Sequence, residues 1–344
     1  MRLLLACPRA ARSGTEDLHL RLLSRVPRAV FSGEEVFMKQ NILHRLWESV
    51  VVLIGVALLI FIMLRVVPGN PIETMMGEHA NQATIDRMTA ELGLDQPLHI
   101  QFIRYITGAL RGDFGTSYSL GKPVSRLMGA AFGNTLKLAV FASLFAWIVG
   151  IICGIISAVK KNGAADHIFM GFSLLGVSMP VFMTAMILQF FFGYYLHWLP
   201  ISGADSWKSF ILPAIALGWN SAAGISRLMR STLLDVLQED YIETARAKGL
   251  TKTAVIIFHA LRNTMLPVVT MMAIQFSGML SGAVITETVF SINGIGRLAV
   301  QAISGRDIPL LQGTVLFSTA VVILGNLAAD CLYAVLDPRI RKEA

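Results

Sequence analysis

Uncharged polar side chains inside long apolar stretches are the residues of this sequence best suited to contact a solute. Such side chains exchange hydrogen bonds without the cost of burying a charge. Four of them, Gln189, Asn220, Gln275 and Ser281, are candidates to line a path for a substrate. Hydrogen bonds between packed helices are the alternative role for each. Ionisable side chains are rare in the same stretches, so a substrate moving there would need an outside source of energy.

Pro180 lies near the middle of the apolar stretch 168–195 and is the fifth candidate for the path. Proline removes a backbone hydrogen bond and crowds the preceding turn, so we expect a bend here. Two interpretations stay open. The bend either faces the path and lets the helices rock between two states, or it is a fixed kink held by packing.

The connection 227–262 carries charges of both signs and is too long for a simple turn. Asp240 stands three residues before Glu243, a spacing that predicts a capped helix start. The helix would cover Tyr241–Lys248. We expect it to end at Gly249, because glycine tolerates the left-handed conformation that follows many helices.

This short helix would also carry Ala245 and Ala247, whose small sides a partner could approach closely. A helix of this kind beside a membrane is either a docking element for another protein or a plain connector. The residues alone leave both interpretations open.

The sequence contains no motif for catalysis, nucleotide binding or metal binding. The nearest approach to a phosphate-binding loop runs from Gly115 to Lys122, but its spacing is one residue too long and Pro123 replaces the magnesium-binding Ser or Thr. The run 294–299 matches a dinucleotide pattern, yet no strand is expected before it. The three cysteines are too scattered for a disulfide framework or a zinc site. We therefore expect no catalytic residue, metal or cofactor on this chain.

The composition is that of a membrane protein. Of 344 residues, 54% are apolar and 15% are charged, and the mean hydropathy is +0.62. Soluble domains have about 25% charged residues. The net charge of +7 is concentrated before residue 48, so it does not indicate a nucleic-acid partner.

Crossing a bilayer as a helix takes about 20 apolar residues. Six stretches qualify, and we expect an all-α protein with six transmembrane helices. The stretches are 49–67, 138–159, 168–195, 209–226, 263–286 and 308–329. We divide the chain into an extension 1–45, a first span 46–67, an external loop 68–133, a core of five spans over 134–336 that includes the loop 227–262, and a tail 337–344.

Lysine and arginine in short connections predict the orientation. Thirteen lie in one set of connections, including 227–262 and both ends, against three in the opposite set. Both termini and the loop 227–262 should therefore be cytoplasmic. Within the external loop, we expect a helix over 84–92, a second helix that ends near Leu110, and a turn at 112–115.

Residues 1–37 do not fit this plan, because they are basic and polar and hold only a few apolar residues before Cys7. A secretory signal needs a core of about 7–15 apolar residues. We expect translation to begin at Met38. A genuine cytoplasmic extension is the alternative.

Several motifs together resemble the permease subunits of bacterial ABC importers for peptides and nickel. The run 240–250 is similar to the EAA loop of that group: Glu243, Ala245 and Gly249 match, and Thr244 replaces the first alanine. Other motifs similar to this group are Gly93–Pro97, Gly112–Gly115, Ile211–Ala214, Glu287–Phe290 with Gly294 and Gly296, Asp330, and Asp337–Arg339. The segment Gly203–Trp207 is similar to glutathione-type members.

The resemblance implies an inner-membrane permease that forms the translocation path for peptides and is not itself an enzyme. It implies as partners a second homologous permease, two ATPase subunits that bind ATP and magnesium, an extracytoplasmic substrate-binding protein and membrane lipid. It implies that seven residues contact an ATPase: Asp240, Tyr241, Glu243, Thr244, Ala245, Ala247 and Gly249. Import of nickel complexes, an ion-coupled carrier and a structural or signalling membrane protein stay open as alternatives.

Overall fold

The computed structural model describes residues 29–66, 81, 86–87, 89–90 and 93–336. The tail 337–344, much of the helix expected over 84–92 and most of the segment 1–37 lie outside the described residues. The chain divides into two compact units, 1–51 and 52–344. The described part of the first unit is the beginning of helix α2, and all other elements belong to the second unit.

The described part of the chain is helical and contains no β-strand. Its elements in chain order are α2 (Ala29–Val66), α5 (Leu98–Leu110), α6 (Val124–Val159), α7 (Ala164–Ser178), α8 (Val181–Leu188), the π-helix η2 (Gln189–Tyr195), the 3-10 turn η3 (Trp207–Phe210), α9 (Ile211–Val236), α10 (Asp240–Ala247), α11 (Lys252–Ala254), the π-helix η4 (Val255–Ala260), α12 (Leu261–Leu280), α13 (Val284–Val289), α14 (Ile295–Ser304) and α15 (Ile308–Leu336).

Five helical segments within the described residues are long and apolar enough to cross a membrane. They are Arg45–Val66, Val124–Val159, Trp207–Val236, Lys252–Leu280 and Ile308–Cys331. A bent pair, α7 followed by α8 and η2, is the sixth candidate if it counts as one span. Each apolar stretch of the sequence coincides with one of these candidates over most of its length, which confirms the all-α membrane architecture.

The helices extend beyond the apolar stretches. Helix α6 begins at Val124, after Pro123, so the expected connection 68–133 already ends in helix. Helix α9 continues past Arg227 to Val236 and occupies the start of the expected connection 227–262. An apolar stretch fixes only the part of a helix that hydrocarbon can cover, because backbone hydrogen bonding continues into polar sequence.

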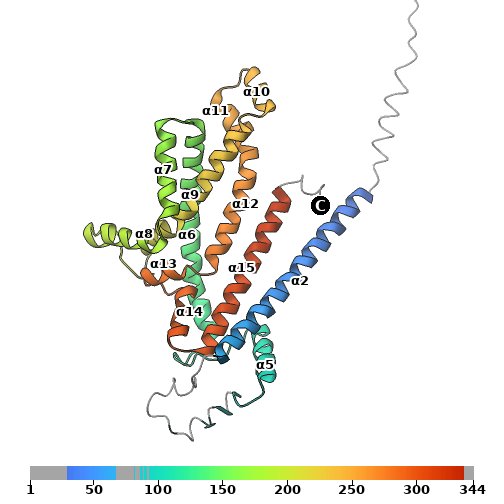
Figure 1. Ribbon diagram of the computed structural model, residues 1–344, viewed down its shortest axis with the longest axis vertical. Helices are drawn as coiled ribbons and strands as arrows, with labels where there is room; N and C mark the ends of the chain where they lie inside the picture. Colours follow the sequence, from blue (N-terminus) through green and yellow to red (C-terminus); the bar gives the residue numbers. More distant parts are fainter. Residues whose placement is uncertain (1–28, 67–80, 82–85, 88, 91–92, 337–344) are drawn as a thin grey trace, which may run out of the picture. The chain divides into compact units, whose positions relative to one another are not determined.

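Pro180 breaks its span. Helix α7 ends at Ser178, Met179 is extended with φ −83° and ψ 129°, and α8 begins at Val181. The helix direction bends by 108° between the two halves, and Figure 1 shows α8 turned away from the axis of α7. A residue before proline is pushed out of the helical region, so Met179 is the position that absorbs the change in direction. The expected bend is present, as a complete interruption.

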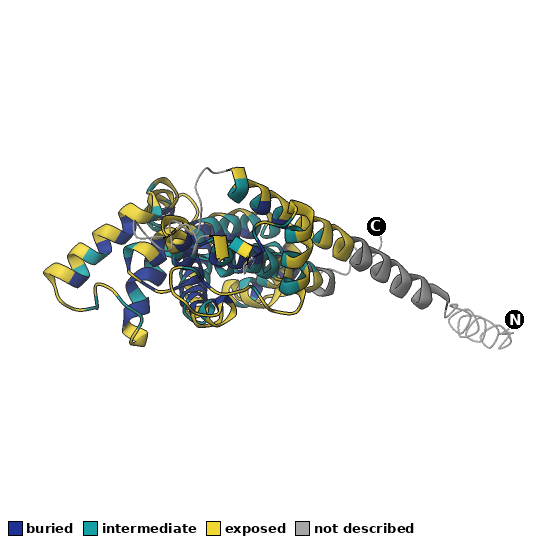
Figure 2. Ribbon diagram, turned by 90° about the horizontal axis from the view of Figure 1, so that it is seen from below, coloured by how far each residue is buried: buried dark blue, intermediate teal, exposed yellow. Residues whose placement is uncertain are grey.

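The parallel helices α6 and α9 form the most extensive helix pair. Glycines allow the approach: a Cβ on Gly154 would lie 2.6 Å from Met229 Cβ, and one on Gly218 would lie 2.6 Å from the Ala142 carbonyl oxygen. Small residues at such contacts let helices in lipid gain van der Waals packing. In residues 52–344, the helices bury the sides that face one another and expose their outer sides (Figure 2).

Substitution of Gly154 tests this packing. We expect Gly154→Ala to lower the melting temperature of the purified protein in detergent, because the new methyl group overlaps Met229 and overpacking typically costs about 1–3 kcal/mol. Gly129→Ala is the matched control in the same helix, since nothing lies within 4 Å of its Cβ position. The control should keep or raise the melting temperature. Equal melting temperatures for the two variants would contradict the close contact.

Candidate functional site

Helix α10 (Asp240–Ala247) lies at one end of the helices of the second unit, opposite the end at which α5 and α14 lie (Figure 1). These are called the α10 end and the α5 end below. Helix α10 follows α9 after three residues, and α11 and η4 lead from it into α12. The predicted helix Tyr241–Lys248 therefore exists, shifted by one residue.

The inner face of α10 packs on its own chain. Ile242 is fully buried and Ala245 is 6% exposed, and both pack with Leu233 of α9 and with Val255 and Ala260 of η4. This corrects the expectation that the small side of Ala245 faces a partner. A larger side chain at Ala245 would separate α10 from α9 and η4.

The start of α10 differs from the expected capping arrangement. Glu239 is the residue that precedes the helix, and no side chain caps it by a hydrogen bond. Asp240 and Glu243 both lie in the first helical turn, so they cannot form the reciprocal pair that the spacing suggested. Negative charge in the first turn still interacts favourably with the helix dipole.

The end of α10 agrees with the sequence. Gly249 has φ +82°, and the amide of Gly249 donates to the Arg246 carbonyl oxygen at 3.0 Å. Nothing lies within 4 Å of a Cβ built on Gly249, so conformation rather than space requires glycine here. A second tie holds the helix, because Asn263 Nδ2 of α12 donates to the Tyr241 hydroxyl at 2.8 Å.

The outer face of α10 is exposed and carries both signs of charge. It includes the predicted contact residues other than Ala245, together with two cations. The exposed residues are Asp240, Tyr241, Glu243, Thr244, Arg246, Ala247, Lys248 and Gly249. This face could bind the surface of another protein.

Beside α10, η4 exposes apolar side chains that sequence reasoning did not select. Phe258 is 73% exposed and Ile257 is 50% exposed. Single-turn π-helices occur frequently at functional sites. The sequence 255–258 did not indicate an exposed π-helix, because its apolar residues are equally suited to a buried turn.

The candidate path residues mostly have structural partners. Gln189 Nε2 donates to the carbonyl oxygens of Ile201 and Val289 at 2.9 and 3.1 Å. Ser281 donates to the Gly278 carbonyl oxygen, and Asn220 makes a long 3.4 Å bond to the Gly176 carbonyl oxygen of α7. The bonds of Gln189 and Asn220 join separate elements and favour the packing interpretation for these two residues, whereas the Ser281 bond lies within the end of its own helix α12.

Gln275 on α12 differs from the other candidates. Its Oε1 is buried and has no hydrogen-bond partner in the described structure. Pro180 is exposed at the break between α7 and α8. The bonds above join none of the five candidates to another, so no single path follows from them.

At the α5 end, a buried carboxylate organises the loop before α14. Glu287 is fully buried and accepts hydrogen bonds from the Thr135 hydroxyl at 2.8 Å and the Arg297 amide at 2.9 Å. Thr135 in turn accepts from the Ile295 amide, so both groups satisfy the start of α14. A Cβ on Gly294 would collide with the Glu287 carboxylate, which explains glycine there.

Sequence reasoning quoted Glu287 and these glycines as a motif but missed this role. Helix α13, not a strand, precedes the run 294–299. The dinucleotide pattern therefore lacks the strand that such a site needs.

Asp307 is a second carboxylate that satisfies an amide at the start of a helix, in this case α15. Its carboxylate caps the Leu310 amide and accepts from the Ser117 hydroxyl at 2.6 Å and from the Ser119 amide and hydroxyl. Burial acts to raise the pKa of Asp307, but these hydrogen bonds outweigh it and hold the pKa below its ordinary value. The segment 115–121 is thereby fixed to the start of α15.

Comparison with known proteins identifies the family. Residues 150–342 match the family described as the binding-protein-dependent transport system inner membrane component, and residues 38–144 match its N-terminal part. The chain belongs to this family. The glutathione transport system permease protein GsiC of Salmonella paratyphi A is 43% identical over 304 residues, which cover 88% of this chain and 99% of the relative. GsiC of Escherichia coli K12 is 41% identical over the same shares.

Among solved structures, an inward-facing MetNI methionine ABC transporter has the same fold. It is 16% identical, the TM-score is 0.54, and the match covers 61% of this chain and 96% of that chain. The family match and the identity of 41–43% to transport permeases confirm the predicted membership in the permeases of ABC importers. The chain is thus a transport component of an inner membrane, and its relatives are named as permeases and not as enzymes.

Ala245 lies on the buried face of α10 and Ala247 on its exposed face, so a tryptophan at each position tests one face. We expect Ala245→Trp to raise amide hydrogen exchange across residues 240–250, because the indole cannot fit against Val255 and Ala260. Ala247→Trp places the same side chain on the exposed face and should leave the exchange unchanged. The measurement is hydrogen–deuterium exchange of the purified protein. Equal protection in both variants would show that Ala245 does not anchor α10.

Proposed function

We propose that this chain is the permease subunit of an ATP-driven importer for short peptides, with glutathione-like peptides as the first candidates. The observation that carries the proposal is the identity to GsiC, because it extends over 99% of that glutathione permease. Import of nickel complexes and an ion-coupled carrier are not favoured. The relatives are named for glutathione, and the family belongs to binding-protein-dependent systems.

The transporter would contain a second homologous permease, two ATPase subunits and an extracytoplasmic substrate-binding protein, in contact with membrane lipid. ATP and magnesium would bind to the ATPase subunits. The exposed apolar side chains of α6, such as Leu144, Ile148 and Ile152, support contact with lipid or with the second permease. Soluble proteins rarely expose so many contiguous apolar residues.

The α10 end would face the cytoplasm, with both termini on the same side. The excess of lysine and arginine in the connections of that end supports this orientation. The exposed face of α10 would then dock on an ATPase subunit. Its mixed charge suits a protein surface, and its packed inner face can transmit force to α9.

Substrate would pass between helices that change their relative positions when ATP is bound and released. The break at Met179 and Pro180 would provide local freedom for this motion. Gln275 would lie on this path, since its buried side-chain oxygen has no partner among the described residues and could accept a hydrogen bond from a peptide.

Ala247→Trp tests the docking role without disturbing the fold. We expect the variant to insert normally, to retain less ATPase in pull-down from membranes, and to lose most transport and substrate-stimulated ATP hydrolysis. The indole would hold the two protein surfaces apart. Glutathione uptake by cells that express the complete transporter is the functional measurement.

Ala130→Trp is the matched control. Ala130 is also exposed, but it lies near the start of α6 at the α5 end. The control should retain ATPase binding. Normal transport by Ala247→Trp would mean that α10 is a plain connector.

A further inference from the structure

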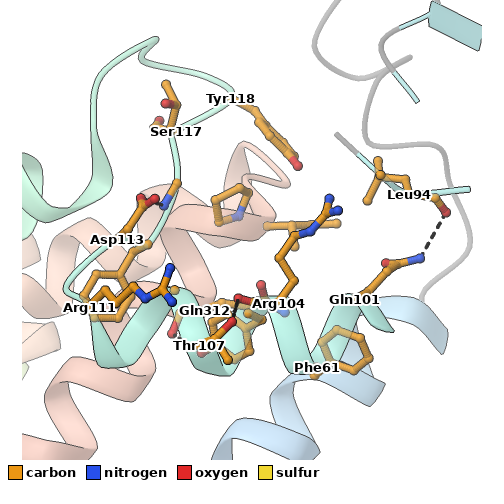
Figure 3. A pocket seen from close by; sticks show the side chains of 18 of the residues that line it. Phe61, Leu94, Gln101, Arg104, Thr107, Arg111, Asp113, Ser117, Tyr118 and Gln312 are labelled. Atoms are coloured by element: carbon orange, nitrogen blue, oxygen red, sulfur yellow. Dashed lines mark hydrogen bonds between the residues drawn. The ribbon is translucent and has the colours of Figure 1, made fainter. Parts of the chain in front are cut away.

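A pocket of about 720 Å³ opens at the α5 end of the second unit. The end of α2, helix α5, the segment 111–121 and the start of α15 enclose it (Figure 3). This volume is in the usual range for small-molecule sites. None of the five candidate path residues lines the pocket.

Two guanidinium groups in the pocket wall have no partner. Arg104 on α5 and Arg111 just after it both line the pocket and are exposed, and neither guanidinium group forms a hydrogen bond or ion pair with any residue that the structure describes. A third guanidinium, that of Arg65, is already engaged. It donates to Gln101 Oε1 at 2.6 Å and to the Phe61 carbonyl oxygen at 3.3 Å.

A buried amide donor in the same wall is also unpartnered. The side chain of Gln312 on α15 is only 7% exposed, and its Nε2 makes no hydrogen bond in the described structure. The Gln312 backbone oxygen, by contrast, accepts from the Tyr105 hydroxyl at 3.2 Å. The Nε2 atom has almost no accessible surface, so it reaches a ligand only when the Gln312 side chain turns toward the pocket that the residue lines.

The pocket wall holds a further hydroxyl group and a carboxylate. Tyr118 contributes a hydroxyl that makes no hydrogen bond within the described chain. Burial, and then the negative charge of Asp307, raise the pKa of Tyr118, so this hydroxyl remains a donor at neutral pH. The carboxylate of Asp113 lines the wall and already accepts from the Gly115 amide at 2.9 Å.

We propose that this pocket binds a carboxylate of a short peptide, with Arg104 and Arg111 as donors and the Gln312 amide as a further donor once its side chain turns to the ligand. Planar guanidinium groups match carboxylates in geometry and charge. Asp113 can take an ammonium group of the same molecule, so the pocket suits a peptide with more carboxylates than ammonium groups, as in glutathione. The inference rests on the proposed peptide import and names the substrate class.

Equilibrium binding to the intact transporter, without its binding protein, tests the site. The permease pair with its ATPase subunits is placed in nanodiscs, and binding of radiolabelled glutathione is measured beside that of Gly-Gly-Gly amide, which has no carboxylate. We expect saturable glutathione binding and weaker binding of the amide. The variant Arg104→Gln/Arg111→Gln should weaken glutathione binding about tenfold or more.

The control variant is Arg126→Gln/Lys137→Gln, which removes two exposed cations of α6 that do not line the pocket. Its affinity for glutathione should stay within about twofold of wild type. Gln312→Met should weaken glutathione binding without lowering the melting temperature, because it removes only an unpartnered donor.

Two results would overturn the site: no saturable glutathione binding to wild type, or equal affinity in the arginine variant. Peptide uptake by cells is the separate readout for the proposed function. If the wild-type transporter imports peptides but the arginine substitutions leave glutathione affinity in nanodiscs unchanged, the site is refuted and the proposed function is not.

Discussion

The close packing of α6 against α9 is the contact on which the other elements depend. Helices in lipid gain little from the hydrophobic effect, so their association relies on close backbone approach and van der Waals contact. Gly150 and Gly154 of α6 and Gly218 of α9 leave room for that approach. The same pair supports both ends of the second unit: Thr135 of α6 holds Glu287 at the α5 end, and Ala158 of α6 packs beneath α10.

The two ends are stabilised in different ways. At the α5 end, Glu287 and Asp307 give their carboxylates to the amides at the starts of α14 and α15, and these charge-assisted bonds fix the loops. At the α10 end, Ile242 and Ala245 hold the helix by apolar packing, and Gly249 sets its end. The polar side chains of α10 are therefore left outside, where they can contact another protein.

The sequence predicted the spans, the break at Pro180 and the extent of α10, because apolar length, proline and glycine act on the chain locally. It did not predict that Ala245 faces its own chain, since that depends on where α9 and η4 lie in space. The capping expectation was wrong because the chain reaches the helical conformation one residue early, at Asp240. Gln312 of α15 comes near Arg104 and Arg111 of the α5 region only through long-range folding, so the sequence gave no signal of a pocket.

Helix α9 connects the α10 end to the broken span. It is continuous from Ile211 to Val236, and α10 follows it after three residues. At its other end, Leu212 packs in one buried cluster with Leu188 of α8 and with Phe290, next to α13. Close-packed interiors transmit strain and do not absorb it. A displacement of α10 would thus reach the α8 region through a rigid helix. The extended backbone at Met179 interrupts the helix in this region, and it supports the proposal that the broken span moves to open a path.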